Sequence, residues 1–139
     1  MLLALHDRLL IQYSERLAHM IYAAADVVLV PSMFEPCGLT QMIALRYGAV
    51  PVVRRTGGLA DTVFDVDNHK GDAEEANGFV FDGADDNSVN SALDRALAMY
   101  KDKPDAWHEL SLRNMGADVS WAASAKSYVD VYRSVALSS

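Results

Sequence analysis

The sequence predicts an α/β fold in which a parallel sheet is covered by helices on both faces. Short valine-rich runs alternate, over the first part of the chain, with segments whose apolar residues recur every three or four positions. From residue 88 onward only the helical spacing remains. Alternating strands and helices are typical of parallel sheets, so we expect a Rossmann-like half-domain with a C-terminal helical segment over residues 88–139.

The first four elements alternate in type. Residues 8–13 predict a short buried strand, and residues 15–25 predict a helix whose apolar face carries Leu17, Met20, Ile21 and Ala24. The run at residues 27–30, closed by Pro31, is typical of a strand buried on both faces. Residues 39–47 predict a second helix that ends at Gly48. Its inward-facing residues are expected to be Leu39, Met42, Ile43 and Tyr47.

The middle of the chain predicts two further strands. Residues 50–53 form one, and residues 78–81 form the last. Between them we expect a sharp turn at Gly57-Gly58, a short helix over residues 59–64 and a polar surface loop over residues 65–77.

The last third of the chain predicts helices. Pro104 separates two stretches of helical spacing, because proline interrupts a helix. The apolar positions are Leu93, Ala96, Leu97 and Tyr100 before it, and Tyr128, Val131, Tyr132 and Val135 after it.

Composition excludes several classes of function. The 139 residues suit one domain, and a net charge of −7 argues against a nucleic-acid partner. No apolar run reaches the roughly 18–20 residues that a membrane span needs. The N-terminus meets His6, Asp7 and Arg8 too early for a secretory signal, and it lacks the composition of an organelle transit peptide. Cys37 is the single cysteine, so an internal disulfide is impossible.

The loop after residues 27–30 is the first candidate site. Ligands of open α/β sheets bind at the carboxyl ends of strands, often against a helix N-terminus. Gly38 lets a ligand approach the backbone, and the N–H groups of Gly38, Leu39 and Thr40 are expected to face an anion such as a diphosphate. The Thr40 hydroxyl adds a donor. Glu35 either binds sugar hydroxyls and stabilises positive charge on a glycosyl carbon, or merely caps the helix.

The second candidate follows residues 50–53 at the same edge of the sheet. Gly57-Gly58 permits a tight turn or close ligand contact, and Arg54 and Arg55 could meet phosphate. The alternative is an ordinary turn with exposed arginines.

The two segments together resemble one enzyme family. Pro31-Ser32-Met33-Phe34-Glu35-Pro36-Cys37-Gly38-Leu39-Thr40-Gln41, and then Arg54-Arg55-Thr56-Gly57-Gly58-Leu59-Ala60-Asp61-Thr62-Val63, resemble the bacterial glycogen synthases and plant starch synthases. The resemblance extends to Ser120-Trp121 and residues 125–128. Residues 64–70 and 81–85 look most similar to the plant soluble class III starch synthases.

The resemblance implies an ADP-glucose-dependent, retaining glucosyltransferase that extends α-1,4-glucan chains. The family has two Rossmann-like domains facing a cleft and needs neither metal nor cofactor, so residues 1–139 would be the C-terminal, nucleotide-sugar-binding lobe. Glu35 would contact the donor glucose and assist at the anomeric centre. The other roles implied by position are glucose binding by Cys37 and Gly38, diphosphate binding by Gly38, Leu39 and Thr40, adenine contact by Tyr13, and shaping of the donor pocket by Thr56, Gly57 and Gly58.

Departures from the family pattern limit these expectations. Ile43 stands where many related transferases carry a second glutamate, and Met33 stands where bacterial members commonly have arginine. Ile43 fits the starch and glycogen synthases and argues against the broader sucrose and lipopolysaccharide transferases. Met33 points toward the plant group, hence toward a plastid. The N-terminal acceptor domain with its lysine-glycine-glycine motif, and the Arg/Lys pair that holds the diphosphate, are expected to lie outside this chain. We therefore expect weak binding of ADP-glucose and no glucose transfer by the isolated chain.

The remaining polar and aromatic residues are interpreted as structural. Asp65-Val66-Asp67 is expected to be solvated surface, and Cys37 has no base partner that would make it a nucleophile. Trp107 and Trp121 are expected to pack in the core or between domains. Metal-ligand spacing is absent from His6, His19, His69 and His108.

Two alternative functions remain open from the sequence. One is a non-catalytic, truncated paralogue that acts as a nucleotide-binding or protein-interaction module. The other is a phosphate-binding regulatory half-domain without sugar preference.

Overall fold

The sheet has three parallel strands in the order in which they follow along the chain. They are β1 (Val27–Val30), β2 (Val50–Arg54) and β3 (Phe79–Phe81), in a computed structural model that describes residues 8–136. All of β2 except Arg54 is buried, because β2 lies between the other two strands. Every side chain of β3 is also buried, since the helix α4 (Asp86–Asp102) packs against this strand. These three strands confirm the predicted parallel sheet.

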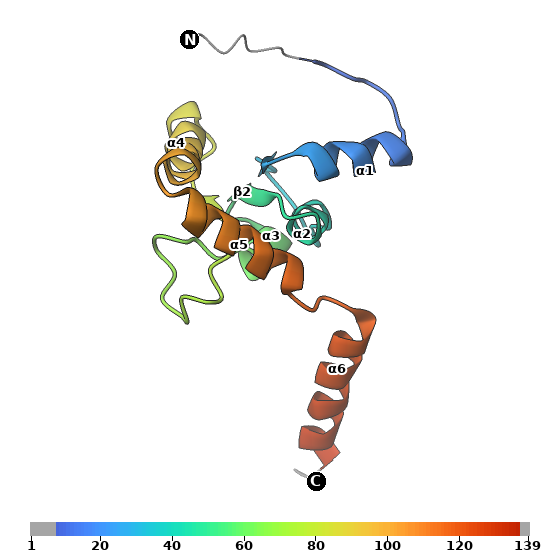
Figure 1. Ribbon diagram of the computed structural model, residues 1–139. Helices are drawn as coiled ribbons and strands as arrows, with labels where there is room; N and C mark the ends of the chain where they lie inside the picture. Colours follow the sequence, from blue (N-terminus) through green and yellow to red (C-terminus); the bar gives the residue numbers. More distant parts are fainter. Residues whose placement is uncertain (1–7, 137–139) are drawn as a thin grey trace.

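Helices cover both faces of the sheet (Figure 1). On one face, α4 and α5 (Pro104–Gly116) pack their Ala92, Ala96, Trp107 and Leu110 against Val50, Val52, Phe79 and Phe81. On the other face, α3 (Gly57–Thr62) packs Leu59 against Val30, Val53 and Val80. The predicted α/β class is therefore confirmed, and Pro104 begins α5 as expected of a helix-interrupting proline.

The helix α2 (Thr40–Arg46) presents a different face to the core from the one predicted. Its buried residues are Gln41, Ala44 and Leu45, whereas Leu39 and Tyr47 are exposed. The prediction is wrong for Leu39 and Tyr47, whereas Met42 and Ile43 are half-buried. The helix α2 packs against β1, β2 and α5 together, and its most buried face is the one that carries Gln41. Gly48 follows the helix with φ +82°, the left-handed conformation expected of a terminating glycine.

The N-terminal strand predicted at residues 8–13 is wrong. These residues are coil and lead away from the sheet, where no neighbouring strand supplies the hydrogen bonds that a strand requires (Figure 1). The helix α1 (Glu15–Ala24) follows, begun by Ser14, whose side chain accepts from the Leu17 N–H at 3.2 Å. None of its residues is buried.

The strand β1 lies at the edge of the sheet. It was predicted to be buried on both faces, and this prediction is wrong. Val30 is its one buried residue, and Leu29 is 39% exposed. Valine-rich composition does not distinguish such an edge strand from a central one.

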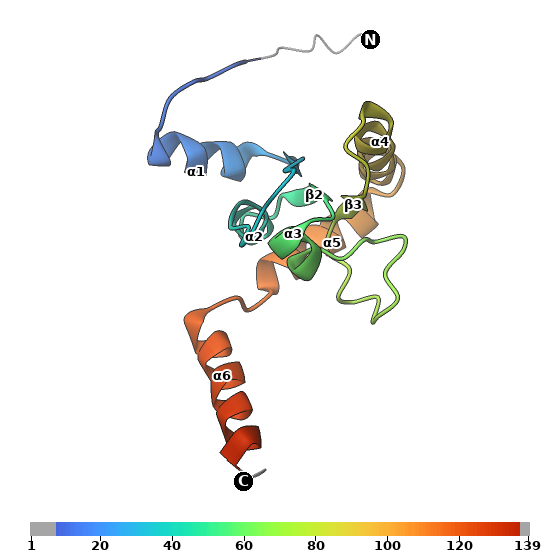
Figure 2. The same ribbon diagram turned by 180° about the vertical axis from the view of Figure 1, so that it is seen from behind.

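The last helix, α6 (Trp121–Ala136), extends away from the sheet (Figures 1 and 2). It has no buried residue, and Trp121 is 89% exposed. Only Trp107 of the two tryptophans therefore packs in a core. Within residues 8–136, none of the helices combines the length and the apolar content required for a transmembrane span.

Candidate functional site

Two loops meet at the carboxyl edge of the sheet, and glycines let them do so. The Gly58 N–H donates to the Glu35 carbonyl at 2.9 Å. A Cβ added to Gly58 would lie 2.0 Å from the Cys37 carbonyl oxygen, and one on Gly57 would lie 2.1 Å from that of Glu35. Neither position has room for a side chain. The paired glycines therefore bring the loop after β2 into backbone contact with the loop after β1.

The Glu35 carboxylate is held within its own loop. Its Oε1 accepts from the Gly38 N–H at 3.2 Å, and its Oε2 accepts from the Ser32 hydroxyl at 3.3 Å. Gly38 lies before Leu39, the N-cap of α2, so Glu35 closes the loop rather than capping the helix. Since each carboxylate oxygen has two acceptor positions, the half-exposed side chain can accept further donors from a ligand.

Gln41 links the two loops from beneath. Its Nε2 donates to the Gly38 carbonyl at 2.5 Å and to the Thr62 hydroxyl at 2.9 Å. Thr62 in turn donates to the Gly58 carbonyl at 2.6 Å. Gln41 is fully buried. A Cβ added to Gly38, whose φ is +72°, would collide with the amide group of Gln41. A chain of hydrogen bonds thus joins the first turn of α3 to the loop that carries Glu35.

The link adds little net stability. Two hydrogen bonds contribute about 1 kcal/mol each, but no group within residues 8–136 bonds the buried Gln41 Oε1, which costs about 1–3 kcal/mol. Sequence reasoning missed this residue because it assigned the inward face of α2 to the apolar positions. Spacing offered a signal, since Gln41 precedes the buried Ala44 and Leu45 by three and four positions.

The backbone donors predicted for an anion are only partly free. Gly38 N–H is engaged by Glu35, whereas no hydrogen bond within residues 8–136 occupies the N–H groups of Leu39 and Thr40. Cys37 and Leu39 are exposed and Thr40 is half-buried beside them. Glu35, Cys37, Leu39 and Thr40 therefore form one surface with Gly57, and Gly38 and Gly58 lie buried beneath it. Thr56 makes no side-chain cap to α3.

Arg54, the last residue of β2, and Arg55, which follows it, both bind protein groups. Arg54 donates to the Met33 carbonyl at 3.3 Å and to the Asp82 carbonyl at 3.4 Å. Arg55 forms an exposed ion pair with the Asp82 carboxylate at 2.8 Å. This favours the structural interpretation of both side chains.

Tyr13 lies apart from this surface. It is 95% exposed, and it lines a hollow of about 370 Å³ whose other walls are His19 and Tyr22 of α1 and Ile43 of α2. None of the Glu35 or Gly57 loop residues lines that hollow. The structure of the described chain therefore does not bring Tyr13 to the other predicted nucleotide-binding residues.

The prediction that Asp65-Val66-Asp67 is solvated surface is wrong for its first carboxylate. Asp65 is 4% exposed and binds the Arg95 guanidinium through both oxygens, at 2.9 and 3.0 Å. It also accepts from the Val80 N–H at 2.7 Å. Burial raises the pKa of Asp65, but the hydrogen bonds from Arg95, Val80 and Asp67 outweigh burial and hold the pKa below its usual value. The pair fastens residues 65–77 to β3 and α4, because Arg95 lies on α4.

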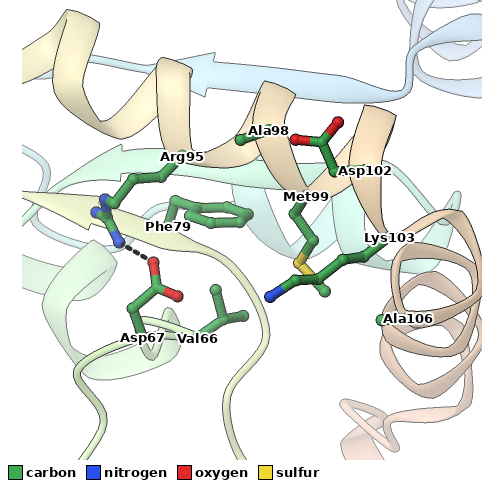
Figure 3. Close-up of a pocket in the computed structure, with 9 residues that line it drawn as sticks. All are labelled: Val66, Asp67, Phe79, Arg95, Ala98, Met99, Asp102, Lys103 and Ala106. Atoms are coloured by element: carbon green, nitrogen blue, oxygen red, sulfur yellow. Dashed lines mark hydrogen bonds and ion pairs between the residues drawn. The ribbon is translucent and has the colours of Figure 1, made fainter.

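Arg95 also neutralises Asp67, at 2.7 Å, at one end of a hollow of about 430 Å³ (Figure 3). Phe79 and Met99 line that hollow, and Lys103 reaches over its other end. Over residues 8–136, no group of three or more His, Cys, Asp or Glu side chains is arranged to hold a metal ion; His6 lies outside these residues.

Comparison with known proteins identifies a family and several relatives of this chain. A family model described as glycosyl transferases group 1 matches residues 6–111. The glycogen synthase of Protochlamydia amoebophila is 50% identical over 130 residues, which are 94% of this chain and 26% of that protein. Starch synthase 3, chloroplastic/amyloplastic, of Arabidopsis thaliana is 54% identical over 131 residues, or 91% of this chain and 13% of that protein.

Solved structures agree with these relatives. The catalytic domain of starch synthase IV from Arabidopsis thaliana, bound to ADP and acarbose, superposes with a TM-score of 0.84 at 49% identity, over 91% of this chain and 26% of that one. Sucrose-phosphate synthase from Thermosynechococcus elongatus gives 0.62 at 29% identity, over 92% of this chain and 30% of that one. The chain spans about a quarter of the glycogen synthase and less of the plant enzyme.

Proposed function

Since the chain belongs to the glycosyl transferases group 1 family, we propose that it is the nucleotide-sugar-binding part of a starch or glycogen synthase. The reaction is the retaining transfer of glucose from ADP-glucose to the non-reducing end of an α-1,4-glucan. The observation that carries the proposal is the contact of the Glu35 loop with Gly57 and Gly58 at the carboxyl edge of a parallel sheet, where α/β proteins bind nucleotides.

Each predicted site residue except Tyr13 has a proposed role at this site. Glu35 binds the donor glucose, and its negative charge stabilises positive charge that develops at the anomeric carbon. Cys37 and Gly38 contact the glucose, and the free N–H groups of Leu39 and Thr40 bind the diphosphate. Thr56, Gly57 and Gly58 fix the shape of the pocket through the backbone contacts described above.

ADP is the nucleotide we propose, because the Arabidopsis starch synthase IV domain was solved with ADP and acarbose. The α-1,4-glucan acceptor and further diphosphate contacts are assigned to the parts of the relatives that lie outside the matched region. Tyr13 contacts adenine only if residues 8–14 fold back toward the loops. No metal and no cofactor enter the proposed reaction.

The cellular location depends on the source of the chain. The Arabidopsis relative is named chloroplastic/amyloplastic, whereas the Protochlamydia relative is bacterial. Because the bacterial and the plant relative are similarly identical to this chain, identity does not decide between the two sources. We propose a plastid location if the chain comes from a plant.

Calorimetric titration of the chain with ADP-glucose, ADP, UDP-glucose and inorganic phosphate tests the proposal. We expect weak binding, ADP-glucose tighter than ADP, and UDP-glucose weaker than both. Glu35→Gln, which preserves the shape and the acceptor for Gly38 N–H, should abolish the advantage of ADP-glucose over ADP. The exposed Glu109→Gln is the matched control.

The other outcomes contradict the proposal. Equal affinity for ADP and phosphate would indicate a phosphate-binding module, and no binding of any nucleotide would indicate a module without a donor site. Robust incorporation of labelled glucose into glycogen by the isolated chain would refute the assignment of the acceptor site to other regions.

A further inference from the structure

We propose that Gln41 is a positioning residue that sets the Glu35–Leu39 loop against the first turn of α3. The inference rests on the proposed function, because it concerns how that surface is kept in its binding geometry. It follows from three contacts of one buried amide: Gly38 O at 2.5 Å, Thr62 Oγ1 at 2.9 Å, and through Thr62 the Gly58 carbonyl at 2.6 Å.

The buried contacts of Gln41 add little to the stability of the fold, so their main effect is to position the Glu35–Leu39 loop. The side chain is fully buried, and its Oε1 has no partner in the described part of the chain, so the free energy gained from the two hydrogen bonds and the cost of the unsatisfied acceptor nearly cancel. An apolar side chain of similar size would fill the same space without the unpaired oxygen. What an apolar side chain lacks is the Nε2 group, whose two N–H bonds reach both loops at once.

Removing the Nε2 group of Gln41 should move the loop that carries Glu35 in a definite direction. Without it, the Gly38 carbonyl can recover a hydrogen bond only by turning toward water, because Gly38 is buried. That movement pulls on the neighbouring Gly38 N–H, which holds the Glu35 carboxylate, and on the Glu35 carbonyl, which accepts from Gly58. Loss of Nε2 therefore displaces Glu35 although Gln41 contacts no substrate in the proposed site.

Amide hydrogen exchange by NMR reads this displacement directly. Gly58 N–H reports the contact between the loops, and Val53 N–H in buried β2 reports the whole fold. In Gln41→Leu we expect exchange at Gly58 to rise roughly tenfold relative to Val53, as lost hydrogen bonds of ordinary strength imply. Thr62→Val should produce a smaller rise, and Thr62→Ser, which keeps the hydroxyl, should produce none.

Asn114→Leu is the matched control. Asn114 is another buried amide, and its Nδ2 donates to the Asn77 carbonyl at 2.9 Å, away from the two loops. Its replacement should accelerate exchange at Gly58 and Val53 together, leaving their ratio unchanged.

Titration with ADP-glucose provides the second measurement. We expect Gln41→Leu to weaken binding roughly tenfold and Asn114→Leu to leave it unchanged. A folded Gln41→Leu protein with an unchanged ratio of exchange rates would overturn the proposal. If that variant fails to fold, equal ratios in Thr62→Val and Thr62→Ser would overturn it instead. If the unaltered chain binds no ADP-glucose, the proposed function fails, while the exchange ratios still decide the role of Gln41.

Discussion

Replacing Gly58 with alanine tests whether the two site loops are as close as the structure shows. The new Cβ would lie 2.0 Å from the Cys37 carbonyl oxygen, whereas ordinary contact begins at 3.4 Å. The loops would have to separate by about 1.4 Å, which breaks the 2.9 Å hydrogen bond from Gly58 N–H to the Glu35 carbonyl. Overpacking costs about 1–3 kcal/mol and the lost hydrogen bond about 1 kcal/mol. We therefore expect Gly58→Ala to lower the free energy of unfolding by about 2–4 kcal/mol.

Urea denaturation measures this change, and Gly116→Ala is its control. Gly116 ends α5, and an added Cβ would meet nothing within 4 Å. Alanine also favours a helix over glycine, so this control should be neutral or stabilising by up to about 1 kcal/mol. Gly58→Ala should in addition abolish binding of ADP-glucose under native conditions. A Gly58→Ala protein as stable as the unaltered chain, with its binding intact, would refute the reasoning.

Three further substitutions test other parts of the structure. Asp65→Asn should destabilise the fold by about 3 kcal/mol near neutral pH, because it removes the buried carboxylate partner of Arg95 and leaves only the exposed Asp67 to pair with it. The folded pKa of Asp65 is lowered by its hydrogen bonds, so its contribution to stability is present at neutral pH and is lost as pH falls through that lowered pKa. Urea denaturation should therefore show the difference between the two proteins shrinking in acid, and a difference that stays constant would contradict this. Trp107→Ala should cost about 3–5 kcal/mol, measured by thermal unfolding. Trp121→Ala should change stability by less than about 0.5 kcal/mol, and equal effects of the two tryptophans would exclude the buried position of Trp107.

Local patterns predicted the elements whose neighbours lie close in sequence. Residues 50–53 form the strand expected of them, and Pro104 separates two helices, because the apolar run and the proline act on their own backbone. The strand predicted at residues 8–13 failed because a strand exists only where a neighbour supplies its hydrogen bonds, and a sequence pattern does not show the neighbour.

The meeting of the two loops was predicted from the sequence, but the contacts inside them were not. Glu35 and Gly57-Gly58 do meet, as expected of loops that leave adjacent parallel strands at one edge. The role of Gln41 was hidden because a buried polar side chain is recognised by its partners, and Thr62 is 21 positions away. Asp65 was misjudged for the same reason, since Arg95 is 30 positions further along.

The way in which residues 65–77 are fastened leaves the middle of that segment free to vary in length. Asn77 accepts from the Phe64 N–H at 2.8 Å and donates to the Thr62 carbonyl at 2.9 Å, so the two ends are clamped together independently of what lies between them. The exposed residues 70–75 then form a closed loop, in which each doubling of length costs only about 0.6 kcal/mol of closure entropy. A peptide tag or a small domain inserted at Gly71 would be carried there without separating the loops that hold Glu35.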